Sequence, residues 1–147
     1  MAKRSDRLML VKELAERKKK QADQMLAASR NRVAQDEAGL QQLQAFLMEY
    51  QSEFIAAGQQ TIDPRGVQTR QAFLNKITST IMKHRQAMER NQQELSAVEN
   101  HWKQAYAGVK AMDVLHEKAL DQERLEADKQ LQKEMDERSL RRSPNFS

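Results

Sequence analysis

Between Leu74 and Ala119 the chain repeats mostly apolar residues at alternating spacings of three and four. This period of about 3.5 residues keeps one narrow stripe facing a partner helix, which is the condition for a left-handed coiled coil. Because a helix cannot bury a stripe against itself, the pattern requires a second helix. The stripe consists of Leu74, Ile77, Ile81, His84, Met88, Asn91, Leu95, Val98, Trp102, Ala105, Val109, Met112, His116 and Ala119.

The composition suits long helices and not a thick globular core. Of the 147 residues, 31% are charged and only 5% are aromatic, so a two-helix seam can be filled but a wide core cannot. The residues that favour helices dominate, and four glycines and two prolines leave few places for turns. The predicted fold class is all-α: a long antiparallel two-helix coiled coil, or α-hairpin, with a C-terminal helical overhang.

The net charge and the absence of cysteine indicate which classes of partner and which cellular compartment to expect. The formal charge of +4 favours acidic protein surfaces or anionic lipid and does not require nucleic acid. The absence of cysteine excludes disulfide bonds and cysteine-based metal sites, which suits the cytosol. No apolar run approaches the ~20 residues that span a bilayer, and the basic start lacks a signal-peptide core. A cytoplasmic protein without a transmembrane segment is expected.

The chain is predicted to form one coiled-coil domain over residues 1–147. The first helix should begin near Ser5 or Asp6, either of which can cap it. The domain is expected to contain helix one at about 6–57, a hinge at 58–66, helix two at about 67–140 and a tail at 141–147.

The hinge is the turn-rich segment inside the chain. Gly58 suits the position just after the end of a helix. Asp63-Pro64-Arg65-Gly66 fits a type I turn, or Asp63 caps a second helix that starts at Pro64. Either alternative is a short connection, which makes neighbouring helices antiparallel and places residue i opposite about residue 124 − i.

The stripe of the first helix is predicted to change phase near Ser29–Val33. Such an offset of four residues, a stutter, locally unwinds a supercoil. The first frame contains Leu8, Val11, Ala15, Lys18, Ala22, Met25 and Ser29, and the second contains Val33, Leu40, Leu43, Leu47, Tyr50 and Phe54.

The overhang, Leu120 to Leu140, has no expected partner in its own chain. It still carries an apolar stripe of Leu120, Ala127, Leu131 and Met135. Because isolated helices depend on packing for stability, this segment is expected to be poorly ordered or to continue as a lone helix that binds another protein.

No catalytic, cofactor-binding or metal site is predicted. The three histidines, His84, His101 and His116, are 17 and 15 residues apart, and none forms a metal-binding pair. His84, His116 and Asn91 fall on the stripe, where polar residues set the register of a coiled coil. An enzyme is not expected, and no cofactor is implied.

The sharpest basic run is Arg17-Lys18-Lys19-Lys20. Consecutive residues fan around a helix, so the run is either a solvated surface or a contact with an acidic protein. Nucleic acid is not expected as a partner, since no aromatic residue interleaves with these charges to stack on bases.

Aromatic residues gather near the hinge: Phe46, Tyr50 and Phe54 precede it and Phe73 follows it. Phe73 flanks the stripe position Leu74 and forms one ridge with Ile77, four residues later. An apolar ridge at the edge of a two-helix rod is either additional core or a docking patch.

Several of these stretches together resemble the flagellar export protein FliJ family. They are Lys12-Glu13-Leu14-Ala15-Glu16, the Leu40/Leu43/Leu47 ladder into Glu49-Tyr50-Gln51-Ser52-Glu53-Phe54, and Gln71-Ala72-Phe73-Leu74-Asn75-Lys76-Ile77 through His84-Arg85. The resemblance implies a two-helix coiled coil similar to the central stalk of rotary ATPases. It also implies three partners: the hexameric flagellar export ATPase, the cytoplasmic part of the export gate membrane protein, and export chaperones. The implied location is cytoplasmic, peripherally associated with the inner membrane at the flagellar base.

By position, the resemblance also assigns residues to two surfaces. The export-gate surface would contain Leu47, Tyr50, Phe54, Phe73, Ile77 and His84. The ATPase end would contain Arg17, Lys18, Lys19 and Lys20, together with the overhang. Relatives often carry Tyr at position 54 and Leu at position 77, and a relative carries Ala where this chain has Thr80.

Three alternatives remain open at this point. The chain could be a general coiled-coil chaperone or scaffold, or the stalk protein of a virulence type III secretion system, which shares these patterns. A nucleic-acid-binding coiled coil is the third class, and it predicts a steep loss of affinity with salt.

Overall fold

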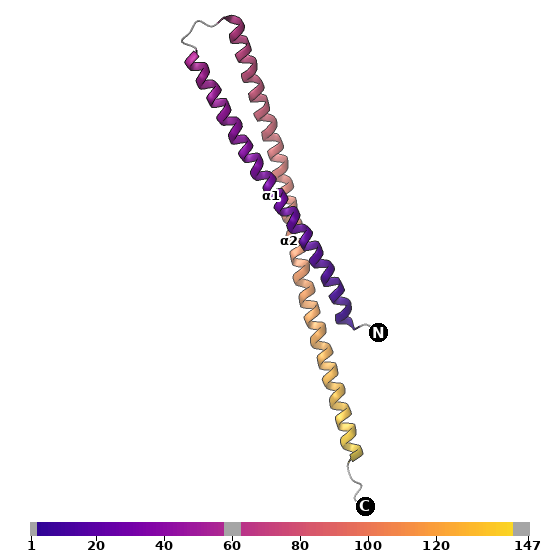
Figure 1. Ribbon diagram of the computed structural model, residues 1–147. Coiled ribbons are helices and arrows are strands. Elements are labelled where there is room, and N and C mark those ends of the chain that lie inside the picture. The colour runs from indigo at the N-terminus through magenta and orange to yellow at the C-terminus, as the bar shows by residue number, and fades with distance from the viewer. Residues whose placement is uncertain (1–2, 58–62, 143–147) are drawn as a thin grey trace, which may run out of the picture. The chain divides into compact units, whose positions relative to one another are not determined.

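The chain forms two helices that pack antiparallel as a helical hairpin (Figure 1). The computed structural model describes residues 3–57 and 63–142. Helix α1 is Arg4–Ala57 and helix α2 is Pro64–Arg142. The prediction of an all-α hairpin is therefore confirmed. The predicted role of Gly58 falls outside the described residues.

The first helix starts just before the two residues predicted to cap it, whereas the second starts at one of the two predicted places. The carbonyl of Lys3 accepts hydrogen bonds from the backbone N–H groups of Asp6 and Arg7, so Lys3 is the residue that flanks α1. The carbonyl of Asp63 accepts from Gly66 at 2.9 Å and from residue 67 at 3.2 Å. Of the two alternatives for the hinge, the structure thus has the second: Asp63 precedes the helix and α2 begins at the proline, whose missing N–H costs nothing there.

The predicted stripe of α2 is the face that packs against α1. Every predicted position from Leu74 to Ala119 is buried or half-buried. Ile77, Ile81 and Ala119 are the most buried of them, with 3% to 7% of their surface exposed. The period of about 3.5 residues therefore placed this face correctly over its whole length.

The stripe of α1 corrects the prediction of a stutter. Val11 and Met25 are 48% and 51% exposed, and Lys18 is exposed, so the first predicted frame is wrong at these three positions. The face instead keeps one phase along the helix. The positions that follow this phase are all buried or half-buried: Ser5, Leu8, Lys12, Ala15, Lys19, Ala22, Leu26, Ser29, Val33, Asp36, Leu40, Leu43, Leu47, Tyr50 and Phe54. Gly39 and Gln44, next to this series, are half-buried as well.

The hairpin divides into two compact units. The hinge unit is Ala22–Trp102, and the terminal unit combines Met1–Gln21 with Lys103–Ser147. Among the described residues, the buried hydrophobic side chains of the hinge unit are Ala22, Leu26, Ile77 and Ile81, whereas Ala119 is the one in the terminal unit.

The overhang continues as part of α2. Leu120 and Glu123 are half-buried, but every residue from Arg124 to Arg142 is exposed. Of the two expectations for this segment, the structure has the continuing helix (Figure 1). In the described part of the chain, neither helix has a stretch with the length and hydropathy that crossing a membrane requires.

Candidate functional site

Three aromatic side chains form a patch on one edge of the hinge unit. Phe73 of α2 lies against Tyr50 of α1, with ring centroids 4.7 Å apart, and against Phe46, at 6.3 Å in an edge-to-face arrangement. Phe46 and Phe73 remain 47% and 38% exposed. We call Phe46, Tyr50 and Phe73 the aromatic patch. Its rings are held in place by one another, but their outer faces are open to a partner.

The six residues assigned to the export gate all lie in the hinge unit, but they differ in exposure. Ile77 is 6% exposed and belongs to the core, while Phe73 is open to solvent. The Phe73–Ile77 ridge is therefore divided between core and surface. The others, Leu47, Tyr50, Phe54 and His84, are half-buried.

Sequence reasoning left Phe46 out of this site. The signal that could have found it is its spacing of four residues from Tyr50, which puts both rings on one side of α1.

A polar layer in the hinge unit fixes how α1 and α2 align. The Nε2–H of His84 donates to the backbone carbonyl of Asp36 at 2.7 Å. The side-chain amide of Asn91 donates to the carboxylate of Asp36 at 2.6 Å. A Cβ on Gly39 would lie 3.2 Å from Cε1 of His84, so glycine makes room for the ring. These contacts support the register-setting role predicted for His84 and Asn91.

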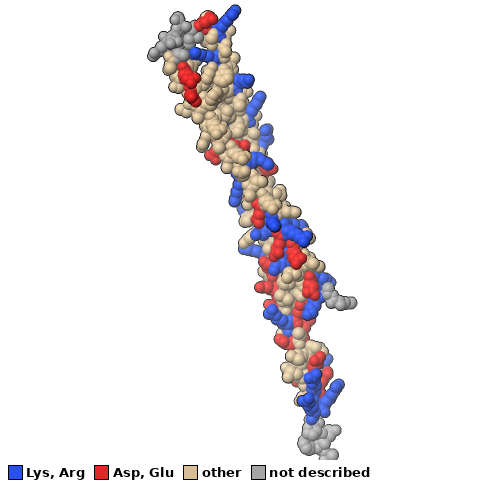
Figure 2. Space-filling model, viewed as in Figure 1, with Lys and Arg blue, Asp and Glu red and all other residues tan. Residues whose placement is uncertain are grey.

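The basic run lies in the terminal unit and does not form a uniform surface. Arg17, Lys18 and Lys20 are exposed, whereas Lys19 is half-buried with its ammonium 5.4 Å from the ring centre of Tyr106. Figure 2 shows side chains of both charges gathered over the terminal unit. Three of the four residues are therefore accessible to an acidic partner surface.

In the terminal unit, polar side chains join α1 to α2. The backbone N–H and hydroxyl of Ser5 donate to the two carboxylate oxygens of Glu123, at 3.0 and 2.7 Å. These hydrogen bonds hold the pKa of Glu123 below its ordinary value. Lys12 forms an ion pair with Asp113 at 3.0 Å, and the hydrogen bond and charge of that carboxylate raise the pKa of Lys12. Glu123 thus accepts from one backbone amide at the positive end of the α1 dipole, where a negative charge is favourable.

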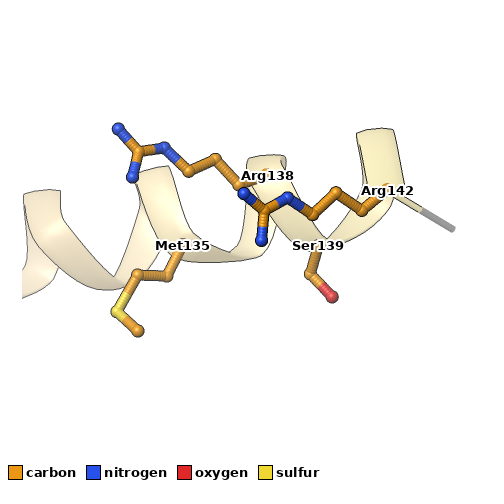
Figure 3. A pocket seen from close by; sticks show the side chains of 4 residues that line it. All are labelled: Met135, Arg138, Ser139 and Arg142. Atoms are coloured by element: carbon orange, nitrogen blue, oxygen red, sulfur yellow. The ribbon is translucent and has the colours of Figure 1, made fainter.

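The described residues contain no group of three or more His, Cys, Asp or Glu side chains that could hold a metal ion. A shallow hollow near the end of α2 is lined by Met135, Arg138, Ser139 and Arg142 (Figure 3). All four side chains come from one helix, so this hollow is part of an open helix surface and not an enclosed ligand site.

Comparison with known proteins gives the chain its family. The model of the flagellar FliJ protein family matches residues 4–145. No curated protein and no solved structure gives a match. The matched residues include both helices, the aromatic patch and the basic run. The chain thus belongs to the FliJ family, and it is a non-catalytic component of the flagellar export apparatus.

Proposed function

We propose that this chain couples the hexameric export ATPase to the cytoplasmic part of the export gate membrane protein. The observation that carries the proposal is the aromatic patch, where two phenylalanines stay 47% and 38% exposed on a chain whose residues are 31% charged. Exposed apolar patches on a helical surface indicate a protein contact. Because the chain belongs to the FliJ family, we expect the contacting protein to be another component of the flagellar export apparatus.

The gate is proposed to dock on the aromatic patch. Phe73 would make the central contact, since it touches both Phe46 and Tyr50 and keeps an open face. Leu47 and Phe54 would extend the contact along α1. Ile77 would not touch the gate but would pack in the core of the hinge unit. His84 would fix the register of α1 against α2, which brings Phe73 next to Phe46 and Tyr50.

The ATPase is proposed to bind the terminal unit. Arg17, Lys18 and Lys20 offer exposed positive charge, which steers association with an acidic surface. Lys19 would contribute less, because its ammonium lies over the Tyr106 ring.

The overhang is proposed to bind and recycle export chaperones. Four of its large apolar side chains, Leu125, Leu131, Met135 and Leu140, are 56% to 77% exposed. An exposed amphipathic helix can lay such residues into a groove of a partner. The protein would then act in the cytoplasm, at the inner membrane beneath the flagellum.

The gate contact can be tested with Phe73→Ala. Calorimetric titration with the cytoplasmic part of the gate should show an affinity loss of about tenfold or more, as for a central interface anchor. Met48→Ala is the matched control, since Met48 is a large apolar side chain that is 70% exposed in the same unit. Equal affinities for Phe73→Ala and the unchanged chain would contradict this docking surface. Ile77 is left unchanged, because truncating a buried residue would also destabilise the hairpin.

The ATPase contact can be tested by reversing the charges of Arg17, Lys18 and Lys20 to glutamate. Activation of ATP hydrolysis by the export ATPase should fall, with a stronger salt dependence of the remaining effect, while gate binding stays intact. Lys76, Lys83 and Arg90 are exposed in the hinge unit, and their reversal is the matched control. If activation is unchanged at physiological salt, these residues form a solvated helix surface and do not contact the ATPase.

A further inference from the structure

Arg70 lies beside the aromatic patch and is not explained by the packing of the hairpin. Its guanidinium sits over the ring of Phe54, 5.1 Å from the ring centre. The two side chains line a small hollow together with Tyr50 and Glu53. Since Tyr50 is also part of the aromatic patch, this hollow and the patch form one continuous surface of the hinge unit.

One donor of this guanidinium lacks an acceptor. The Nη1 atom of Arg70 is buried and has no hydrogen-bond partner within the part of the chain that the structure describes. The Phe54 ring attracts the positive charge but does not satisfy the N–H groups. A buried donor without an acceptor is unfavourable, and a guanidinium stays charged at every physiological pH. Within the described residues this donor therefore contributes no hydrogen bond to the hairpin, whereas an acceptor on a bound partner would give it one.

We propose that Arg70 anchors a carboxylate of the protein that docks on the aromatic patch. The inference rests on the proposed function and identifies the chemistry of the gate segment: an acidic residue for Arg70 beside an apolar side chain for Phe73. A carboxylate matches the planar fork of a guanidinium with two parallel hydrogen bonds. Because Nη1 of Arg70 is buried in the free chain, the side chain turns outward in the proposed complex to make them. A peptide is the occupant because it supplies both groups at once. Glu53, on the rim of the hollow, is exposed and has no ion pair with Arg70 among the described residues.

The experiment measures binding of the full chain to the cytoplasmic part of the export gate by calorimetry. Arg70→Met keeps a stem that packs on Phe54 but removes every N–H donor, and it should weaken binding by about tenfold or more. Arg70→Lys keeps the charge without the fork and should recover part of that loss. Arg90→Met is the matched control, because Arg90 is an exposed arginine of the same helix and unit.

Acidic residues of the gate segment are then replaced one at a time by their amides. One of these replacements should weaken binding to the unchanged chain but should add nothing to the loss in Arg70→Met. The melting temperature of free Arg70→Met should be no lower than that of the unchanged chain, since the variant removes a buried donor without an acceptor, and this separates lost binding from lost folding.

The outcomes separate the inference from the proposed function. If Phe73→Ala weakens binding but Arg70→Met does not, the carboxylate anchor is wrong and the aromatic docking surface stands. If Arg70→Met weakens binding and every amide replacement adds to its loss, Arg70 contacts something other than a gate carboxylate and the inference is overturned. If the gate does not bind the unchanged chain, both the inference and the proposed function fail.

Discussion

The hinge unit and the terminal unit pack the same two helices with different chemistry. In the hinge unit, Leu26, Ile77 and Ile81 are at most 7% exposed and fill the space between α1 and α2. In the terminal unit, the corresponding face of α1 carries Lys12 and Lys19, whose charged ends reach Asp113 and Tyr106.

This difference in packing indicates which unit contributes more to the stability of the hairpin. Burying a large aliphatic side chain contributes about 1.5–3 kcal/mol, whereas an ion pair that water can reach contributes much less. The hinge unit is thus expected to be the more stable of the two. The terminal unit gives up little when its contacts are rearranged, which suits the partner binding that we propose for it.

The largest effect is expected from truncating the core of the hinge unit. Ile81→Ala should lower the free energy of unfolding by about 2–4 kcal/mol, since it leaves a cavity at a buried position. Met82→Ala is the neighbouring control: that side chain is 60% exposed, and its loss should change stability by less than about 0.5 kcal/mol. Met112→Ala in the terminal unit should fall between them. Urea unfolding followed by circular dichroism measures all three, and equal losses at Ile81 and Met112 would break the comparison.

Trp102→Ala should have the next largest effect, about 2 kcal/mol, which is below the range for a fully buried tryptophan because this indole is half-buried. The indole is half-buried at the edge of the hinge unit, and its N–H donates to the carboxylate of Asp23 at 2.5 Å. Trp102→Phe should recover most of the packing but not the hydrogen bond. A Trp102→Ala protein that melts normally but loses a partner would show that the ring is a binding contact instead.

Two glycines provide a matched pair of small effects. A Cβ at Gly108 meets nothing within 4 Å, so Gly108→Ala should stabilise the terminal unit by about 0.5–1 kcal/mol through helix propensity alone. Gly39→Ala should gain less or lose stability, because its Cβ would press on a His84 ring held by the carbonyl of Asp36. Equal gains in thermal unfolding would mean that the His84 ring moves aside freely.

The smallest effect is a dependence on acid at the end of the terminal unit. Because the pKa of Glu123 is lowered from 4.5, its contacts with Ser5 favour the folded state above that value and are lost as pH falls through the lowered pKa. The first turn of α1 should then fray. Carboxyl titration by NMR measures the pKa of Glu123 directly, and the Glu123→Gln protein should lack this pH dependence. A pKa of Glu123 at or above 4.5 would show that the contact does not persist in solution.

The sequence predicts most of this fold and only part of the candidate site. The stripe of α2 could be followed because aliphatic residues occupy most of it, so the period of about 3.5 residues is visible. The first half of α1 could not, because Lys12 and Lys19 stand on the packed face. A long lysine covers apolar surface with its stem and reaches outward with its charge, so composition alone assigns it to the surface.

The contacts that complete the site depend on both helices at once. Phe46 joins the aromatic patch only because Phe73 lies opposite, and Gly39 matters only because His84 faces it. Neither partner can be read from its own stretch of sequence. That the Nη1 donor of Arg70 has no acceptor among the described residues is visible only once α1 and α2 have been placed together.

The unbroken phase of the packed face makes the hairpin modular in length. Seven residues are two turns of a coiled-coil helix, so removing one heptad from α1 and the opposing heptad from α2 would leave every remaining side chain on its original face. A shortened protein would keep the aromatic patch and the basic run unchanged in chemistry. Removal of four residues from α1 alone would instead turn the two ends of that helix relative to each other. Paired heptad deletions therefore offer a way to ask whether flagellar export depends on the length of this protein separately from its surfaces.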